Sequence, residues 1–147
     1  MLLKDIIQKV ADTLKDSAEL KYVDQANVFI GGRAGDTSYP AIYIEPLKEE
    51  ENDETYPRQL IHADILIMMI LRCQDKDLQI IGNDTVRGVV DALNDMKKAL
   101  SADRTLCGYA KRTWVVESEF GVLDEYPTRS ITVTFRVEYE QNYLTRA

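Results

Sequence analysis

The N-terminal stretch of the chain repeats an apolar side chain at steps of three and four residues, with charged residues between them. Steps of that size return to one side of an α-helix, which has about 3.6 residues per turn. The pattern predicts a helix over residues 2–16. Its apolar stripe consists of Leu3, Ile6, Ile7, Val10 and Leu14.

Two short β-prone segments follow this helix and are separated by glycines. Residues 26–30 end at Gly-Gly-Arg-Ala-Gly-Asp (31–36), where glycine permits the positive φ of a turn. Residues 39–45, Tyr-Pro-Ala-Ile-Tyr-Ile-Glu, form a second strand with a proline near its start, where the missing N–H is tolerated. Together the two segments predict a hairpin.

An acidic run follows between Pro46 and Pro57. Neighbouring carboxylates repel one another and are costly to bury, so the run predicts a solvated, mobile loop at about residues 47–58. We expect these acids to act on a partner surface or on DNA through their summed field, and not as single catalytic groups. The residues concerned are Glu49, Glu50, Glu51, Asp53 and Glu54.

The segment from Gln59 to Arg72 is rich in β-branched and apolar residues. Between Ile65 and Leu71 every position is hydrophobic, which is typical of a strand that is covered on both faces. The segment therefore predicts the central strand of the sheet.

A long amphipathic pattern comes next. Asp75 is a suitable N-cap, because its carboxylate can accept the unpaired N–H groups of a first helical turn. Apolar positions then keep to one face from Leu78 to Leu100 and predict a single second helix. Gly82 and Gly88 inside it cost helix stability, so we expect them to mark a close approach to the sheet.

Two alternating segments close the chain. Trp114, Val116, Ser118 and Phe120 alternate with more polar neighbours, which predicts a strand with these four residues on one face. Residues 131–140 show the cleanest period-two pattern and predict a half-exposed strand whose core face includes Val133 and Phe135. Residues 121–127 are expected to join the two as a hairpin connection.

The order of elements is therefore helix, three strands, helix, two strands. It predicts an α+β fold with a mixed, mainly antiparallel sheet and two helices packed on one face. The length of 147 residues suits a single domain, and 45% hydrophobic with 29% charged residues is typical of a folded globular chain.

Charge and cysteine content limit the partners and the cellular compartment that we expect for the protein. Twenty-five acidic against eighteen basic residues give a net charge of −7, which disfavours sequence-independent DNA binding and contact with anionic membranes. The N-terminus lacks the unbroken apolar stretch of a secretory signal, so we expect an intracellular product. Cys73 and Cys107 are then expected to be reduced thiols.

The candidate chemical motifs are incomplete. The glycine-rich segment 31–36 lacks the Lys-Ser/Thr and the following helix of a phosphate-binding loop, so it is read as a turn. The acidic run lacks the spacing of a calcium-binding EF-hand. His62 is the only histidine, without zinc-ligand spacing or a nucleophile elbow, and is interpreted as one side chain on a strand. We expect no enzyme, no cofactor and no metal. Tyrosines are assigned to core or interface packing: Tyr39, Tyr43, Tyr139 and Tyr143.

The complete layout resembles the tail terminator family of long-tailed bacteriophages, also described as minor tail or tail completion proteins of the phage lambda type. The resemblance rests on the N-terminal helix, the Tyr-Pro-Ala-Ile-Tyr-Ile strand at 39–44, the charged excursion at 48–58 and the long strand at 59–73. It also includes the second helix running into Asp-Arg-Thr-Leu-Cys-Gly (103–108) and the closing strand at 130–139.

The resemblance implies a homohexameric ring without an active site, which caps a finished tail tube and presents it to the head. The implied partners are further copies of the chain, the tail tube protein and the head completion or connector protein. DNA would pass through the ring without specific binding, and no membrane is involved. The location implied is the tail of a virion assembled in the host cytoplasm. Two alternatives stay open, namely another neck or tail ring component (head closure or tail tube) and a non-viral module or small enzyme with a ligand cleft.

Overall fold

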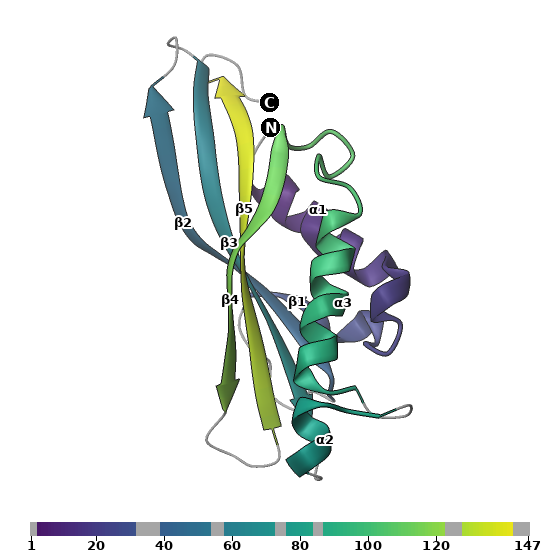
Figure 1. Ribbon diagram of the computed structural model, residues 1–147. Helices are drawn as coiled ribbons and strands as arrows, with labels where there is room; N and C mark the ends of the chain where they lie inside the picture. The colour runs from purple at the N-terminus through teal and green to yellow at the C-terminus, as the bar shows by residue number, and fades with distance from the viewer. Residues whose placement is uncertain are drawn as a thin grey trace.

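The computed structural model describes residues 3–31, 39–53, 58–72, 76–83, 87–122 and 128–142 (Figure 1). Three α-helices lie at Leu3–Asp16 (α1), Lys76–Ile80 (α2) and Val89–Ser101 (α3), and two 3₁₀ turns at Ala18–Leu20 (η1) and Gln25–Asn27 (η2). The strands span Val28–Ile30 (β1), Ala41–Asp53 (β2), Arg58–Arg72 (β3), Arg112–Val122 (β4) and Thr128–Asn142 (β5).

The described strands form one five-stranded sheet in the order β1-β2-β3-β5-β4. β1 is parallel to β2, and every other neighbouring pair is antiparallel. The fold is thus α+β with a mixed, mostly antiparallel sheet, as predicted. The segment 59–72 is confirmed as the central strand, and the segment at 121–127 joins two adjacent antiparallel strands.

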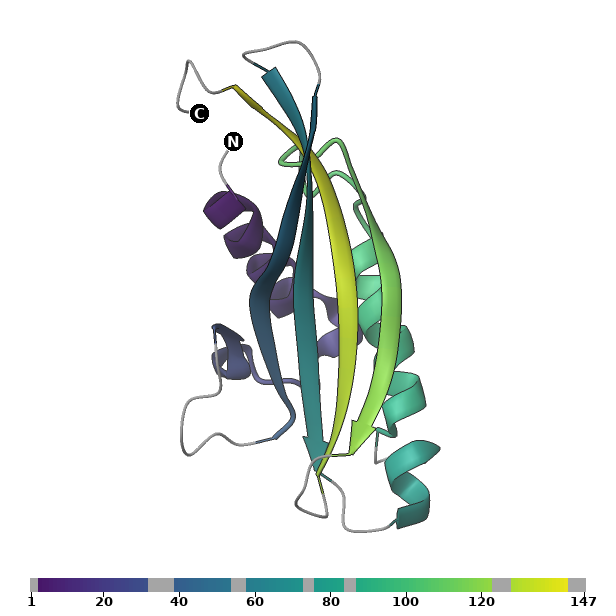
Figure 2. The same cartoon turned by 90° about the vertical axis from the view of Figure 1, so that its left-hand side faces the viewer.

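Helices α1 and α3 lie on the same face of the twisted sheet, which we call the inner face (Figure 1). Figure 2 looks onto the opposite, outer face, with α1 behind β2 and α3 behind β5 and β4. The core fills the space between the helices and the inner face. Its strand residues confirm the predicted alternation of the last strand and include Ile61, Ile65, Ile67, Val133, Phe135 and Tyr139.

The outer face carries a second, smaller apolar cluster. Ala41, Tyr43 and Ile70 are buried there, and the rings of Phe29 and Tyr43 stack with centroids 5.4 Å apart. This cluster explains why the segment 65–71 is apolar at every position, because both faces of β3 are partly covered at this end.

The prediction of a single long second helix is wrong. α2 ends at Ile80 and α3 begins at Val89, with Gly88 as its N-cap. A Cβ on Gly88 would lie 2.5 Å from the carbonyl oxygen of Ile80 and 2.7 Å from the backbone nitrogen of Gly82, whose φ is +72°. The glycines mark a close approach, as expected, but to each other's backbone and not to the sheet.

The predicted hairpin of residues 26–45 is also wrong, because β1 runs parallel to β2 with Val28 opposite Ile42. A parallel partner requires the chain to return to the start of the first strand. The three-residue β1 is only about 10 Å long, so the distance over which the chain has to return is short.

The acidic loop predicted at 47–58 is instead strand over most of its length. β2 continues to Asp53, and β3 begins at Arg58. The physical reason is that a strand alternates its side chains between two faces and leaves those of residues 45–51 exposed, so no carboxylate there has to be buried. The expectation of solvation is confirmed for Glu49–Glu51, whereas the expectation of a loop is not. Glu54 lies outside the described residues.

β4 departs from the simple alternation read from the sequence. Val115 pairs with Phe135 and Glu117 with Thr134, so Val116 is an extra, bulged residue. Beyond the bulge the faces exchange. Ser118 pairs with Val133 on the inner side, and Trp114 remains on the outer side opposite Arg136.

Candidate functional site

The outer face carries a ladder of charged side chains across four strands. Residues that pair across neighbouring strands share a face, so each rung can be followed from β2 to β4. One rung consists of Lys48, Asp64, Arg136 and Trp114, and the next of Glu50, His62, Glu138 and Arg112.

Asp64 and Arg136 form the buried centre of the first rung. Asp64 is only 4% exposed, and Arg136 donates to its two oxygens from Nε at 2.7 Å and Nη2 at 3.0 Å. The hydrogen bonds from Arg136 hold the pKa of the Asp64 carboxyl below its ordinary value, although burial opposes this shift. The ammonium of Lys48 stands 3.9 Å from Asp64 Oδ2 on the exposed side.

The second rung joins His62 to Glu138 through a 2.7 Å contact between Nε2 and Oε2. The guanidinium of Arg112 lies 3.4 Å from Glu138 Oε1 and 4.6 Å from the centre of the Trp114 ring. Burial raises the pKa of the Glu138 carboxyl, but His62 and Arg112 together outweigh it, and the pKa is lowered overall. His62 is thus a strand side chain in polar contact with a neighbouring carboxylate, in line with its interpretation from the sequence.

The predicted acidic residues do not converge on one point. Glu50 lies on the outer face, 3.3 Å from the ammonium of Lys48, whereas Glu49 lies on the inner side and accepts a 3.1 Å hydrogen bond from the hydroxyl of Tyr139. Glu51 follows on the same side as Glu49, and Asp53 ends β2. The structure therefore spreads the charge along a sheet edge.

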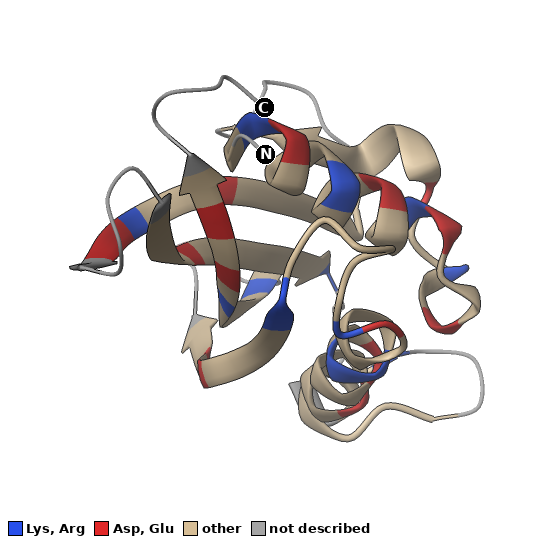
Figure 3. Ribbon diagram, turned by 90° about the horizontal axis from the view of Figure 1, so that it is seen from above, with Lys and Arg blue, Asp and Glu red and all other residues tan. Residues whose placement is uncertain are grey.

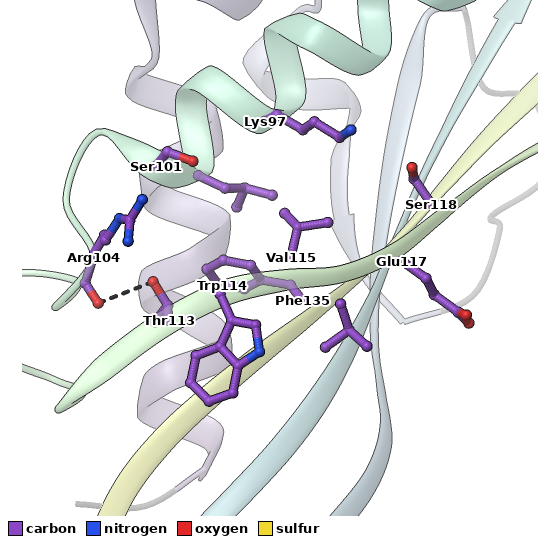
Figure 4. Close-up of a pocket in the computed structure, with 11 residues that line it drawn as sticks. Lys97, Ser101, Arg104, Thr113, Trp114, Val115, Glu117, Ser118 and Phe135 are labelled. Atoms are coloured by element: carbon purple, nitrogen blue, oxygen red, sulfur yellow. Dashed lines mark hydrogen bonds between the residues drawn. The ribbon is translucent and has the colours of Figure 1, made fainter.

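A hollow of about 460 Å³ lies between the end of α3 and β4 (Figure 4). Lys97, Ser101 and Arg104 border it from the helix side, and Val115 and Phe135 from the sheet. The hydroxyl of Thr113 donates a 3.0 Å hydrogen bond to the carbonyl of Arg104, which ties the turn after α3 to β4. The basic side chains stand at its rim and do not point toward a shared acceptor, so the arrangement offers no organised acid–base chemistry.

The turn after α3 contains the Asp-Arg-Thr-Leu-Cys-Gly segment of the sequence resemblance. The Asp103 carboxylate accepts hydrogen bonds from the N–H and hydroxyl of Thr105 and from the N–H of Cys107, and these lower the pKa of Asp103 to about 2. Leu106, Cys107 and Gly108 all have positive φ, and Leu106 is buried in the core. The segment is thus a backbone-fixing turn.

A buried carboxylate also fastens the start of α3. Asp95 accepts two 2.8 Å hydrogen bonds from Arg87 and one of 2.9 Å from the hydroxyl of Tyr22. Burial and the neighbouring Asp95 raise the pKa of Tyr22 far above its ordinary value. The cluster connects the segment after η1, the segment before α3 and α3 itself, and serves packing.

The two long edges of the sheet each have a bulge with an exposed apolar residue. In β2 the register shifts between Pro46 and Lys48, which leaves Leu47 unpaired and 53% exposed. In β4 the unpaired Val116 is 43% exposed. Among the described strands, β4 is the last of the sheet, and β1 covers β2 only from Ile42 to Ile44.

Other chemical features add little. Cys107 is a free, exposed thiol, and Cys73 lies outside the described residues, as does Tyr143. The described residues contain no group of three or more potential metal ligands. None of the described helices is long and apolar enough to cross a membrane. Of the glycine-rich turn at 31–36 only Gly31 is described, with φ +102°.

Sequence reasoning missed the ladder and both bulges. Asp64, Arg136 and Glu138 are ordinary charged positions in strands, and only the cross-strand register makes them partners. The one available signal was that each of these charged residues alternates with apolar neighbours along its strand, which places it on the face opposite the core. The bulges had weaker signals, a leucine within an acidic run and the adjacent pair Val115 and Val116.

No protein-family model matches the sequence, and no curated protein matches it. Among solved structures, the fold is similar to a chain from the virion of a native gene transfer agent (GTA) particle. The TM-score is 0.55 at 13% sequence identity, and the match covers 96% of this chain and 100% of that chain. At this identity the similarity establishes the fold that the two chains share.

Proposed function

We propose that this protein is a structural component of a phage-like virion, and that its place is that of a tail terminator. The observation that carries the proposal is the full-length fold similarity to a chain of a gene transfer agent virion, which leaves almost no part of either chain unmatched. The sequence resemblance to tail terminators adds the finer assignment.

In this role six copies close into a ring, cap the finished tail tube and offer the surface to which the head is joined. Partners are the tail tube protein and the head completion or connector protein. Each copy carries a net charge of −7, so a ring multiplies an acidic field that repels phosphates. DNA can then pass without being held.

The architecture of the described surface supports a structural role better than a ligand-binding one. A ligand site gathers a few polar groups in an enclosed apolar cavity. Here the polar groups of the outer face are paired with one another in a ladder, and the hollow beside α3 has its charged residues at the rim. These features favour a protein that acts by binding other subunits through its surface.

The test is the mass of the assembly by light scattering, for the protein alone and mixed with purified tail tubes, together with electron microscopy of the tube ends. We expect a hexameric ring at one end of each tube. A protein that is strictly monomeric in both samples contradicts the proposal. Binding to heads only, or polymerisation into a tube, would assign it to head closure or the tail tube instead.

A further inference from the structure

The two bulged edges of the sheet lie at the same height, although they belong to strands at different sides of the molecule. Pro46, Ile65, Phe135 and Val115 form one continuous rung from β2 to β4. Leu47 is the residue after Pro46, and Val116 is the residue after Val115. Each exposed bulge residue therefore stands within about one residue spacing, ~3.3 Å, of the same rung.

We propose that the β2 edge of one copy docks against the β4 edge of the next copy, with Leu47 meeting Val116 at the centre of the contact. The proposal rests on the proposed function, because the occupant of each edge is a second copy of this chain in a ring. It names the two surfaces that close that ring.

A ring requires this kind of contact. In a closed rotational assembly each copy uses two different surfaces, and the surface on one side must fit the surface on the other. Rotation about an axis that runs along the strands keeps every residue at its height. The exposed residues of the two edges can meet only when their heights are close. Leu47 and Val116 lie on opposite sides of the common rung, each within about one residue spacing, ~3.3 Å, of it.

Strand direction fits as well. β2 and β4 run in opposite directions, because three antiparallel pairs link them: β2 with β3, β3 with β5, and β5 with β4. Copies placed side by side in one orientation therefore bring β2 next to an antiparallel β4. The antiparallel arrangement of the sheet continues across the contact.

The charges of the two edges are complementary on one side of the central rung, whereas on its other side Glu45 of β2 and Glu117 of β4 share a rung and carry like charges. The rung that has Glu50 at the β2 edge has Arg112 at the β4 edge. Glu49 and Glu51 flank the acid, and Lys111 precedes the base. Figure 3 shows the acidic end of β2 and the basic start of β4 at separate edges of the sheet. Opposite charges facing each other across an interface orient the partners and favour their encounter.

The bulges also limit unspecific pairing of these edges with other strands. A flat, free edge is a template for uncontrolled β-pairing, and a bulge interrupts its row of hydrogen-bonding groups. Recognition then depends on side chains. Ile30 on β1 and Phe120 on β4 are also exposed, but their rungs lie two residues apart, so they are not part of the proposed contact.

The test uses one defective edge at a time. We expect Leu47→Asp and Val116→Asp each to abolish ring formation, because a charge is placed in the apolar centre of the contact. Val90→Asp is the matched control, since Val90 is 45% exposed, close to the 43% of Val116, and belongs to α3 and not to an edge strand. This variant should assemble as the wild type does. Circular dichroism and thermal unfolding verify that each variant is folded.

Mixing the two defective variants gives a sharper result. The intact β2 edge of Val116→Asp fits the intact β4 edge of Leu47→Asp, and the resulting pair has only defective edges left. An equimolar mixture should therefore contain dimers and nothing larger. If both variants are monomeric alone and remain monomeric when mixed, the head-to-tail pairing of these edges is wrong.

A chemical cross-link covers the case in which an aspartate variant fails to fold. In a background with Cys73→Ser and Cys107→Ser, Leu47→Cys with Val116→Cys should give, with a short bismaleimide, a ladder of linked copies up to the hexamer. Either cysteine alone should give none beyond a dimer. A wild-type ring without the ladder overturns the edge assignment and leaves the proposed function standing. A wild type that is monomeric even with tail tubes overturns both.

Discussion

The carboxylate of Asp64 depends on one neighbour. It is 4% exposed and accepts two hydrogen bonds from Arg136, which is itself half-buried. Removing one partner of a buried ion pair leaves an uncompensated charge and costs about 3–5 kcal/mol. We predict that Arg136→Met lowers the free energy of unfolding by about 3 kcal/mol in urea titrations at neutral pH. Arg112→Met, at an exposed guanidinium, should cost about 1 kcal/mol or less.

The same pair predicts a dependence of stability on pH. Arg136 lowers the pKa of folded Asp64 below the unfolded value of 3.8, so the folded state holds its proton less tightly. The stabilisation is complete above about 3.8 and is lost as the pH falls through the lower folded pKa. The difference in unfolding free energy between the wild type and Asp64→Asn should therefore shrink below that pH. A difference that stays constant down to acid unfolding would show that the pair contributes nothing through ionisation.

The junction between α2 and α3 depends on the absence of a side chain at Gly88. Its φ of −80° is open to any residue, so the requirement is purely one of space. A Cβ there would lie 2.5 Å from the backbone oxygen of Ile80, which cannot move aside as a flexible side chain could. We predict that Gly88→Ala destabilises the protein by about 1–3 kcal/mol, which lowers the melting temperature by several degrees. Val90→Ala, at an exposed position two residues later, should have an effect near zero.

The elements that the sequence predicted well are those whose pattern is local. The stripe of α1 and the alternation of β5 are set by burial against a single core, so apolar spacing is enough to find them. The predictions that were wrong concern features that depend on which segments of the chain lie side by side in the fold. Nothing in residues 26–45 distinguishes a parallel pair from a hairpin, and the helix from Leu78 to Leu100 kept its apolar period although two glycines break it.

The candidate surface was predictable only in part, for the same reason. The acidic residues were found because charge is visible in composition, but their interpretation as a loop ignored that a strand can carry exposed carboxylates on an edge. Leu47 and Val116 become important only through two independent registers that meet at one rung. A single sequence contains no direct record of either register.

At the scale of the whole molecule, the sheet has one covered face, one charged face and two free edges. α1 and α3 cover the inner face (Figure 2). On the outer face, paired charged side chains form the ladder. The long edges remain for lateral contacts. A subunit with this division can form a ring through its edges while its outer face, its helices and the two ends of the sheet stay available to other partners.

The acidic residues 49–51, 53 and 54 are predicted to act in the assembly by their summed field. We expect the fivefold variant with Glu49, Glu50, Glu51, Asp53 and Glu54 all changed to Gln to keep its fold, because exposed charges contribute little to stability and their mutual repulsion is relieved. Ring formation, docking or retention of DNA should weaken, and the loss should diminish as salt is raised, since screening acts within about 8 Å at physiological salt. The five single substitutions, scored beside it by assembly of infectious particles at several salt concentrations, should each have a small effect. One carboxylate whose loss abolishes function while the other four are silent contradicts the field and indicates a specific site on β2.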